Sequence, residues 1–469
     1  MIGAMESQEL QTITDWTGGS LLKGDPSARV AGISTDSRRV RPGELFLALR
    51  GERFDGHDFA AAALSKGAAG VILDHPVPEI DTRYAGKALI RVEDTLQALA
   101  GLARGYRALF DILAVAVTGS NGKTTTKNLI GRLLDADMKT LTAPASYNNL
   151  IGVSLTVLRI ERNHQAVVFE VGMNRPGEIG ELGEICRPRI AVVTNVGPAH
   201  IGNLGSLEKI AREKAELFKS LEGEKTAFLN IDDHRVRAMA RSAPGPVIGF
   251  GFDPSAQVRA SNLSYLPDGV KFDLNLADER MTIHSPLPGR YNVYNLLAAL
   301  GVADHLHISP ARMKEAISKA DLPSQRMEEV VIEGVLLIDD AYNANPASMR
   351  AALDSWLMMK VKGRRVMVSG DMHELGEFSR AEHQAWGEEL GESALDYLIF
   401  LGPWSRYSAR AAEEKGFPDR RIFAVDDSQT VAELLRGILQ PGDSVLIKGS
   451  RVMKMEEIVE RLKGSTTYE

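Results

Sequence analysis

The stretch AVAVTGSNGKTTT, residues 114–126, is the segment around which the rest of the chain is organised. An apolar run leads into a glycine-containing turn, and Lys123 and Thr124 follow before a helical pattern begins near Lys127. In such a loop, backbone N–H groups surround phosphate oxygens, the lysine reaches the terminal phosphates and the threonine hydroxyl ligates Mg²⁺. The pattern predicts a nucleotide-binding loop. The alternative is a strand-to-helix turn that contains these residues by chance.

The spacing of this loop departs from the common motif. Only two residues separate Gly119 from Gly122, and Val117 stands where the earlier glycine is expected. The loop is therefore a shortened variant, and by itself it does not distinguish a kinase, a switch, a motor or a ligase. The residues expected to bind the nucleotide here are Gly119, Ser120, Asn121, Gly122, Lys123, Thr124 and Thr125.

Length and composition narrow the class of protein. A chain of 469 residues is too long for one hydrophobic core, and about three domains are expected. The net charge of -7 comes from interspersed acidic and basic residues, so no basic stripe for nucleic acid is present. Cys186 is the only cysteine, which excludes an intrachain disulfide and fits a reducing compartment. The sequence has no signal-like N-terminus and no membrane-length apolar run, so we expect a cytoplasmic enzyme. We also expect a monomer.

The first segment, residues 1–95, mixes short strands and helices with polar loops. Residues 45–49 and 70–73 have the apolar runs of strands, and residues 59–65 have a helical pattern. The loops at 34–39 and 51–57 carry hydrogen-bonding side chains beside these strands. They suit a polar ligand, although ordinary surface turns have the same composition.

The central segment, residues 96–320, alternates helices and strands around the loop. One strand, 166–171, carries Glu170 near its carboxyl end, and another, 190–196, leads to His200. Ligands of open α/β sheets bind outside the carboxyl ends of the strands, so both side chains are expected near Mg²⁺ held by Thr124. The alternatives are a solvated carboxylate and a loop histidine satisfied by backbone, because Mg²⁺ prefers oxygen ligands.

A predicted helix over 206–219 has a lysine within its apolar stripe. Lys214 must extend to solvent, pair with an acid or be chemically altered, because an unpaired buried ammonium is costly. Residues 247–285 then change to period two, which predicts antiparallel hairpins. In the following helix Asn292 and Asn295 share a face, where amides suit a base edge, or where Asn292 caps the helix.

The last segment, residues 321–469, is a second alternating α/β pattern that predicts a doubly wound sheet. Polar residues follow its strand-like runs and are expected to gather at one sheet edge. Any single one of these residues could cap a helix or belong to a turn. That explanation fits the whole set less readily than a binding site does. The expected lining residues are Asp340, Asn343, Asn345, Asp371, Lys448, Ser450 and Arg451.

Taken together, the motifs resemble those of the Mur ligase family over nearly the full length, and the short phosphate loop is the form this family uses. The segments that carry the resemblance are 36–38, 51–57, 118–124, 148–152, 170–173, 195–200, 291–295, Arg326, 339–346, 370–376 and 448–451. It implies a small α/β N-terminal domain, a central nucleotide-binding domain with a mainly parallel sheet plus antiparallel hairpins, and a Rossmann-like C-terminal domain. The three domains are expected at 1–95, 96–320 and 321–469.

The resemblance also implies a reaction. Mur ligases form an amide with ATP through an acyl phosphate, and the third segment is similar to the members that add D-alanyl-D-alanine to UDP-MurNAc-tripeptide. The tetrapeptide Asp-Asn-Pro-Arg, typical of the diaminopimelate-adding members, does not occur here. The identity of the third peptide residue, lysine or diaminopimelate, stays open. So do a folate-type or other amide ligase and a regulatory nucleotide-binding module.

Residue roles follow from the same resemblance. Lys123 would neutralise charge during phosphoryl transfer, Thr124 and Glu170 would hold one Mg²⁺, and Glu170 with His200 would lie near a second. Lys214 occupies the place of a lysine that is often carbamylated. Asn292 and Asn295 would face adenine, and Arg326 with Asp340 would reach ATP from the third domain. The expected substrate contacts are Ser37, Arg53 and Phe54 for the uridine end, Lys448, Ser450 and Arg451 for the dipeptide carboxylate, and Asn148, Asn149, Asn343, Asn345 and Asp371 elsewhere.

Overall fold

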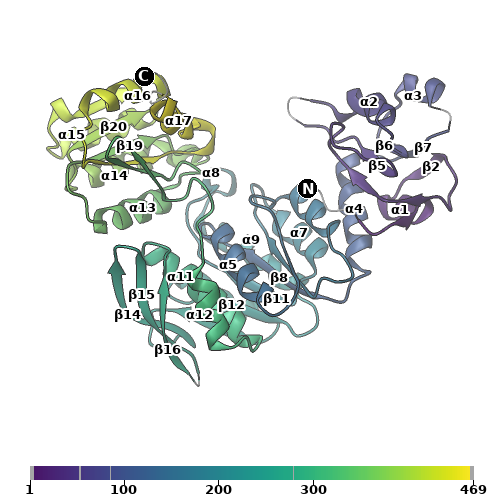
Figure 1. Cartoon of the computed structure of the whole chain (residues 1–469), viewed down its shortest axis with the longest axis horizontal. Helices are drawn as coiled ribbons and strands as arrows, with labels where there is room; N and C mark the ends of the chain where they lie inside the picture. The colour runs from purple at the N-terminus through teal and green to yellow at the C-terminus, as the bar shows by residue number, and fades with distance from the viewer. Residues whose placement is uncertain (1–4, 52–53, 85, 278, 465–469) are drawn as a thin grey trace.

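The structure, a computed structural model, describes residues 5–51, 54–84, 86–277 and 279–464. Three α/β domains follow one another along the chain, and the central domain lies between the other two (Figure 1). The predicted fold class is confirmed. The sheets use residues 20–91, 113–285 and 328–448, so the domain boundaries we predict fall between sheets and stay predictions. Among the described residues, no helix has the length and hydropathy needed to cross a membrane.

The N-terminal domain is built on a five-stranded sheet in the order β2-β7-β6-β5-β4, parallel except at β2. Strands β5 and β6 are buried along their whole length, as expected for continuous apolar runs. The expected helix over 59–65 begins at Ala60, because a 3₁₀ turn capped by the Asp55 carboxylate precedes it. The elements are β1 Gln8–Glu9, α1 Leu10–Thr17, β2 Ser20–Lys23, β3 Arg29–Val30, β4 Gly32–Ser34, β5 Glu44–Leu47, η1 Gly56–Phe59, α2 Ala60–Ser65, β6 Gly70–Leu73, α3 Pro78–Arg83, β7 Ala88–Arg91 and α4 Thr95–Arg107.

The central domain has a nine-stranded sheet in the order β16-β15-β14-β13-β12-β11-β8-β10-β9. It is parallel from β9 to β14, and β14, β15 and β16 form the antiparallel extension that the period-two pattern predicts. The elements are β8 Leu113–Thr118, α5 Lys123–Asp135, β9 Thr140–Thr142, α6 Leu150–Val157, β10 Ala166–Glu170, α7 Glu178–Cys186, β11 Ile190–Val193, α8 Ile201–Leu204, α9 Leu207–Ala215, η2 Glu216–Ser220, β12 Thr226–Asn230, α10 His234–Ala238, η3 Met239–Ser242, β13 Val247–Gly251, β14 Val258–Leu266, β15 Gly269–Asn275, β16 Arg280–Ser285, α11 Arg290–His305 and α12 Pro310–Ser318.

This strand order positions the site. Strand β8, which leads into the phosphate loop, lies between β10 and β11. Glu170, the last residue of β10, pairs in register with Val117, next to the loop. Because parallel strands present their carboxyl ends at one edge, the ends of all three strands meet at the loop.

The C-terminal domain has a six-stranded sheet in the order β17-β18-β22-β19-β20-β21, parallel except at β17. The last helix begins at Glu456, after a 3₁₀ turn that ends where Lys454 adopts left-handed backbone (φ 47°). The elements are β17 Glu328–Ile332, β18 Val335–Asp339, α13 Pro346–Met358, β19 Arg365–Gly370, η4 Gly376–Phe378, α14 Ser379–Gly391, β20 Tyr397–Leu401, α15 Ser405–Glu414, η5 Asp419–Arg421, β21 Ile422–Val425, α16 Ser428–Ile438, β22 Ser444–Lys448, η6 Arg451–Met453 and α17 Glu456–Gly464.

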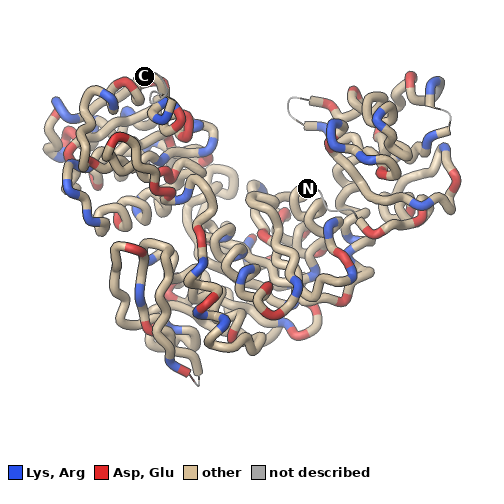
Figure 2. The backbone as a smooth tube through the Cα atoms, viewed as in Figure 1, with Lys and Arg blue, Asp and Glu red and all other residues tan. Residues whose placement is uncertain are grey.

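Acidic and basic side chains alternate over all three domains (Figure 2). Most of the ion pairs that they form lie at the surface, where each contributes little to stability. Two buried pairs lie at the carboxyl ends of β10 and β22. There, Lys127 pairs with Glu170 and Lys448 pairs with Asp340 away from solvent.

Candidate active site

A cavity of about 980 Å³ opens at the phosphate loop, between the central and C-terminal domains. Its wall includes the carboxyl ends of the central parallel strands and the first turn of α13. The structure therefore brings together most of the residues that the sequence analysis singles out. Those that line the cavity are Ser120, Asn121, Gly122, Lys123, Thr124, Thr125, Asn148, Asn149, Glu170, His200, Asn295, Arg326, Asp340, Asn343, Asn345, Lys448 and Arg451.

The phosphate loop is held in place before any nucleotide binds. Gly122 has a φ of 81° and packs so closely against Asn295 that a β-carbon would collide with that side chain. This position therefore requires glycine. The backbone N–H of Asn121 donates to Asn195 Oδ1 (2.9 Å), and its carbonyl accepts from Thr194 Oγ1 (2.6 Å). Lys123 Nζ donates to the Gly119 carbonyl (2.8 Å), so its ammonium lies over the loop.

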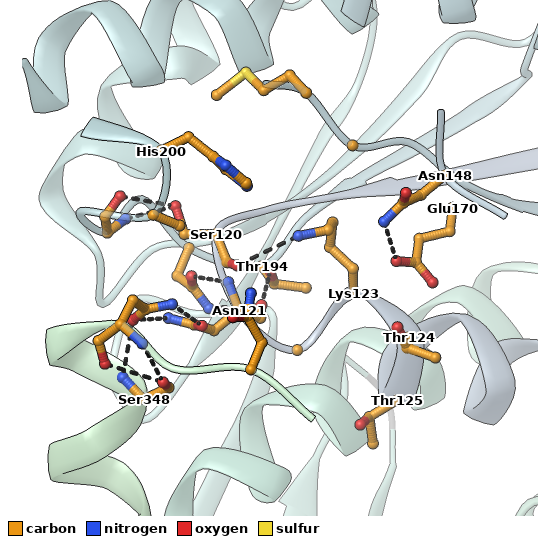
Figure 3. Close-up of a pocket in the computed structure, with 18 of the residues that line it drawn as sticks. Ser120, Asn121, Lys123, Thr124, Thr125, Asn148, Glu170, Thr194, His200 and Ser348 are labelled. Carbon is orange, nitrogen blue, oxygen red and sulfur yellow. Dashed lines mark hydrogen bonds between the residues drawn. The ribbon is translucent and has the colours of Figure 1, made fainter. Parts of the chain in front are cut away.

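Glu170 is buried at the edge of the cavity with one free oxygen (Figure 3). Its Oε1 accepts from Asn148 Nδ2 (2.9 Å), while Oε2 has no hydrogen-bond partner and lies 3.6 Å from Lys127 Nζ. The alternative of a solvated carboxylate is wrong, because the residue is only 1% exposed. An orphaned buried carboxylate oxygen is the kind of group that a bound cation satisfies.

Lys214 is buried, which excludes extension of its ammonium to solvent. Within the described ranges its side-chain ammonium makes no hydrogen bond or ion pair. Desolvation lowers the pKa of Lys214 well below its usual value, and the nearby charge of Lys123 lowers it further, although the nearby charge of Glu213 partly raises it. The Lys214 ammonium therefore neither reaches solvent nor pairs with an acid. A neutral or chemically modified amine fits its surroundings.

His200 meets the C-terminal domain. It has left-handed backbone (φ 60°), and its Nδ1 lies 2.6 Å from Glu374 Oε2. Hydrogen bonding to His200 lowers the pKa of the Glu374 carboxyl, so the contact is a charged one on the glutamate side. A backbone-satisfied loop histidine, the alternative we consider, does not describe this residue. The backbone N–H of Gly202 also donates to the Glu374 carbonyl (2.9 Å).

Three C-terminal residues approach the loop or the cavity wall. Arg326 Nη2 donates to Thr124 Oγ1 (3.2 Å), and its guanidinium lies over the Tyr342 ring. Lys448 Nζ donates to Asp340 Oδ2 (2.6 Å) and to the Asn343 carbonyl (3.0 Å). The Lys448 charge is thus compensated by Asp340 and the Arg451 charge by Glu456 (2.8 Å), and Arg451 is the more exposed of the two cations.

Several predicted contacts do not face the cavity. The Asp371 carboxylate accepts the backbone N–H groups of Trp404 (3.2 Å) and Ser405 (2.6 Å) at the start of α15, so it is a helix-capping group. Ser450 is buried and receives a hydrogen bond from the His373 backbone (2.8 Å). We therefore correct the direct substrate roles predicted for Asp371 and Ser450.

Asn292 also differs from its prediction. It is fully buried, donates to the Pro288 carbonyl (2.8 Å) and accepts from Asn295 Nδ2 (3.0 Å), so it does not reach a base edge. The capping alternative is wrong too, because Gly289 is the N-cap of α11. Asn295 lines the cavity, but its Oδ1 accepts from Thr126 Oγ1 (3.1 Å) and braces α11 against α5.

The predicted uridine contacts lie in the N-terminal domain, outside the residues that line the cavity. Ser37 is half-buried beside the Asp36–Arg38 ion pair, and Phe54 is 71% exposed. Arg53 lies outside the described residues. A cluster of Asp55, His57 and His75 occurs nearby, but its polar atoms are satisfied by one another, by Asp74 and by Arg50. It is a structural network.

Sequence reasoning missed part of the lining. Tyr294 donates to Asp232 Oδ2 (2.9 Å), and both line the cavity together with Asn230 and Asp233. The signal was available, because Asn230 ends strand β12 as Glu170 ends β10, and Asp232 and Asp233 follow shortly after it. The partners Lys127 and Glu374 carried no such signal, since their importance comes from what they contact.

Comparisons with known proteins agree with this geometry. Three profiles match successive segments: the Mur ligase family catalytic domain at residues 29–107, the Mur ligase middle domain at 117–303 and the Mur ligase glutamate ligase domain at 325–451. The UDP-N-acetylmuramoyl-tripeptide–D-alanyl-D-alanine ligase of Bacillus subtilis is 33% identical, over 98% of this chain and 99% of that protein.

Solved structures show the same architecture. A crystal structure of MurF from Acinetobacter baumannii has a TM-score of 0.89 and 31% identity, covering 98% of this chain and 99% of that one. MurF ligase from Thermotoga maritima in complex with ADP has a TM-score of 0.80 and 28% identity, covering 92% and 97%. The phosphate loop, the orphaned glutamate and the buried lysine thus lie in a framework shared from end to end, and this chain belongs to the Mur ligase family.

Proposed function

We propose that this protein is an ATP-dependent ligase that joins D-alanyl-D-alanine to UDP-MurNAc-tripeptide. The relatives matched over nearly their whole length carry this activity in their names. The observation that supports it in the structure is a shared cavity in which the phosphate loop faces polar residues of the C-terminal domain. A nucleotide bound at the loop and an amine bound by the C-terminal domain could lie side by side in this cavity.

The reaction needs ATP because a carboxylate is a poor electrophile. An oxygen of the terminal tripeptide carboxylate attacks the γ-phosphorus of ATP, which forms an acyl phosphate and releases ADP. The amine of D-alanyl-D-alanine then attacks the acyl carbon, phosphate leaves, and the amine loses a proton. Closing the cavity between domains excludes water, which would otherwise hydrolyse the acyl phosphate.

The cationic side chains around the loop have distinct roles. Lys123 leaves the Gly119 carbonyl to bind the terminal phosphates, and Arg326 adds a second cation at Thr124. Such donors stabilise charge that develops during phosphoryl transfer. Arg451 is the candidate for the dipeptide carboxylate, because it lines the cavity and is more exposed than Lys448, although each has an acidic partner. Tyr294 and Asp232 are candidates for the nucleoside end.

Mg²⁺ fits the residues present. The orphaned Glu170 Oε2 and the Thr124 hydroxyl are oxygen ligands of the kind Mg²⁺ prefers, and His200 lies in the same cavity wall. When bound, the ion would neutralise phosphate charge. Lys127 lies beside the same carboxylate, with its ammonium 3.6 Å from the Glu170 oxygen that has no hydrogen bond.

Lys214 fits a carbamate. Carbon dioxide adds to a neutral amine and one proton is lost, so the reaction requires the depressed pKa that burial and Lys123 produce. The product is an anion, which converts an unfavourable pair of neighbouring ammonium groups into an attractive pair with Lys123. Cytoplasmic location and a monomeric state stay predictions.

A product assay tests the proposal. Purified protein with ATP, Mg²⁺, D-alanyl-D-alanine and either the lysine or the diaminopimelate tripeptide should release phosphate and form UDP-MurNAc-pentapeptide, detected by mass. A panel of other amines should give no comparable product. Phosphate release that depends on a different amine would identify another amide ligase, and nucleotide binding without any product would favour a regulatory module.

A further inference from the structure

The side chains of Asn121 and Asn345 form a reciprocal amide pair between two domains. Asn345 Nδ2 donates to Asn121 Oδ1 (2.8 Å), and Asn121 Nδ2 donates to Asn345 Oδ1 (3.3 Å). Asn121 belongs to the phosphate loop, and Asn345 is the N-cap of α13 in the C-terminal domain. Figure 3 shows Asn121 beside the start of the helix that carries Ser348.

The two ends of Asn121 are held by different domains. Its backbone N–H and carbonyl are bound by Asn195 and Thr194, both in the central domain. Only its side chain is bound by the C-terminal domain. If the two domains separated, the Asn121 backbone would stay bound to the central domain and only its side-chain amide would lose its partner. The contact between the two amides therefore forms only when the C-terminal domain packs against the central domain.

Asn345 links this contact to a whole helix. Its Oδ1 also accepts the backbone N–H of Ser348 (3.0 Å), and Ser348 Oγ accepts from the Asn345 backbone (3.0 Å), which completes a capping box. One carboxamide thus fixes both the start of α13 and the loop. Asn345 is buried, and its Oδ1 is used twice within the protein. Its hydrogen bonds go to the protein and not to an open substrate position.

We propose that Asn345 is a positioning residue that clasps Asn121, so that the phosphate loop and the C-terminal domain adopt their reactive arrangement together. This rests on the proposed ligase function and replaces the direct substrate role predicted for Asn345. The clasp ties the domain that binds the phosphates of ATP to the domain expected to deliver the amine. Its loss lowers the fraction of closed, reactive enzyme without removing a substrate contact.

Aspartate substitutions separate the clasp from the helix cap. Asn345→Asp keeps a good N-cap, because Asp accepts from Ser348 N–H, but it loses the donor to Asn121. Asn121→Asp loses the opposite donor. Each single variant keeps one inter-amide bond, whereas the double variant has none and places two carboxylates face to face. Asn121→Ala provides the matched background in which residue 345 has no partner.

The effect of Asn345→Asp on kcat should depend on which residue stands at position 121. Asn345→Asp should lower kcat about threefold alone, about thirtyfold in the Asn121→Asp background and not further in the Asn121→Ala background. The KM for D-alanyl-D-alanine should change less than the kcat. Melting temperatures of the Asn345→Asp and wild-type proteins should agree. A raised KM with unchanged kcat, or equal effects in all three backgrounds, would overturn the clasp.

A second measurement does not depend on activity. Small-angle scattering of the nucleotide-free full-length protein should give a larger radius of gyration for Asn121→Asp/Asn345→Asp than for wild type. An unchanged radius would refute the clasp even if wild type is an active ligase. Absence of pentapeptide from wild type, together with the expected scattering change, would instead refute the proposed function and leave the interdomain contact standing.

Discussion

Lys214 shows how a single buried amine constrains the chemistry of the site. It lies in the apolar face of α9, is 3% exposed, and has Lys123 as a neighbouring charge. An ammonium at this position would be opposed by both desolvation and repulsion. Both effects lower the pKa of Lys214 and so favour the neutral amine, the form that the proposed carbamate would require.

Replacing this amine should slow the reaction strongly. Lys214→Ala should lower kcat/KM by at least about a hundredfold, the scale of removing one preorganised electrostatic group. If the reactive form is a carbamate, millimolar propionate should restore part of the activity by occupying the vacated space as an anion. Lys209→Ala, an exposed lysine on the same helix, is the control and should be active. Full activity of Lys214→Ala would rule out a catalytic Lys214.

Asp339 provides a pH-dependent stability test. Burial raises its pKa to about 6, and nearby Glu328 and Asp340 contribute. In the unfolded chain the carboxyl titrates near 3.8, so the folded protein binds the extra proton between these values. Stability is therefore lost as pH rises from about 4 to about 6.

Asn in place of Asp339 removes the charge and keeps an oxygen for the Ala341 backbone N–H. Asp339→Asn should melt about 5 °C higher than wild type at pH 7, and the difference should vanish near pH 4. Thermal unfolding followed at several pH values measures this. A constant difference across the pH range would show that the effect does not come from ionisation.

At the scale of elements, the nucleotide site depends on how helix α11 packs on α5. A hydrogen-bonded chain runs from Thr126 through Asn295 to Asn292 and ends on the Pro288 carbonyl. The same Asn295 side chain leaves no room for a β-carbon at Gly122. Asn292 and Asn295 thus set the distance between the phosphate loop and the following helices, and the base contact expected of Asn295, which lines the cavity, stays a prediction.

Truncating the middle of this chain should be costly. Asn295→Ala leaves the Thr126 hydroxyl and the side-chain Oδ1 of Asn292 buried without these hydrogen-bond partners. The free energy of unfolding should fall by about 2 kcal/mol. Asn128→Ala, a half-buried position on α5, is the control and should cost less than about 0.5 kcal/mol. Chemical denaturation measures both. Equal losses would show that the chain of amides contributes nothing special.

At the scale of the whole molecule, α4 joins the N-terminal domain to the central one. Its Tyr106 hydroxyl donates to the Ile160 carbonyl (2.7 Å) and accepts from the Glu6 backbone N–H (2.9 Å). On the same helix, Gly101 and Gly105 let the backbone approach Trp16 of α1 so closely that a β-carbon would collide. This tight contact sets where the N-terminal domain lies.

Adding a methyl group at this junction should loosen it. Gly105→Ala forces the Trp16 ring to move and should destabilise the junction by about 1 to 3 kcal/mol, seen as earlier proteolytic release of the N-terminal domain. Gly180→Ala is the matched control, because that helix position of α7 has open space and Ala favours helix. Unchanged proteolysis of Gly105→Ala would mean that the junction tolerates the shift.

Much of this protein can be predicted from sequence because its signals are local. The phosphate loop, the order of strands and helices, the period-two hairpins and the place of Lys214 in an apolar stripe each depend on about ten or twenty neighbouring residues. Predictions failed where a polar residue had two possible uses. Asp371 and Asn292 have the residue types of ligands, yet their side chains satisfy buried backbone and amide groups of the protein itself.

The sequence by itself therefore determined the fold class, the nucleotide loop and the candidate residues of the site. Only the tertiary structure decided the partners: Lys127 for Glu170, Glu374 for His200 and Asn345 for Asn121. The physical reason is the separation along the chain of the residues that interact. Backbone conformation and apolar periodicity are set by neighbours along the chain, whereas a contact between residues 121 and 345 depends on how two separately folded domains pack together.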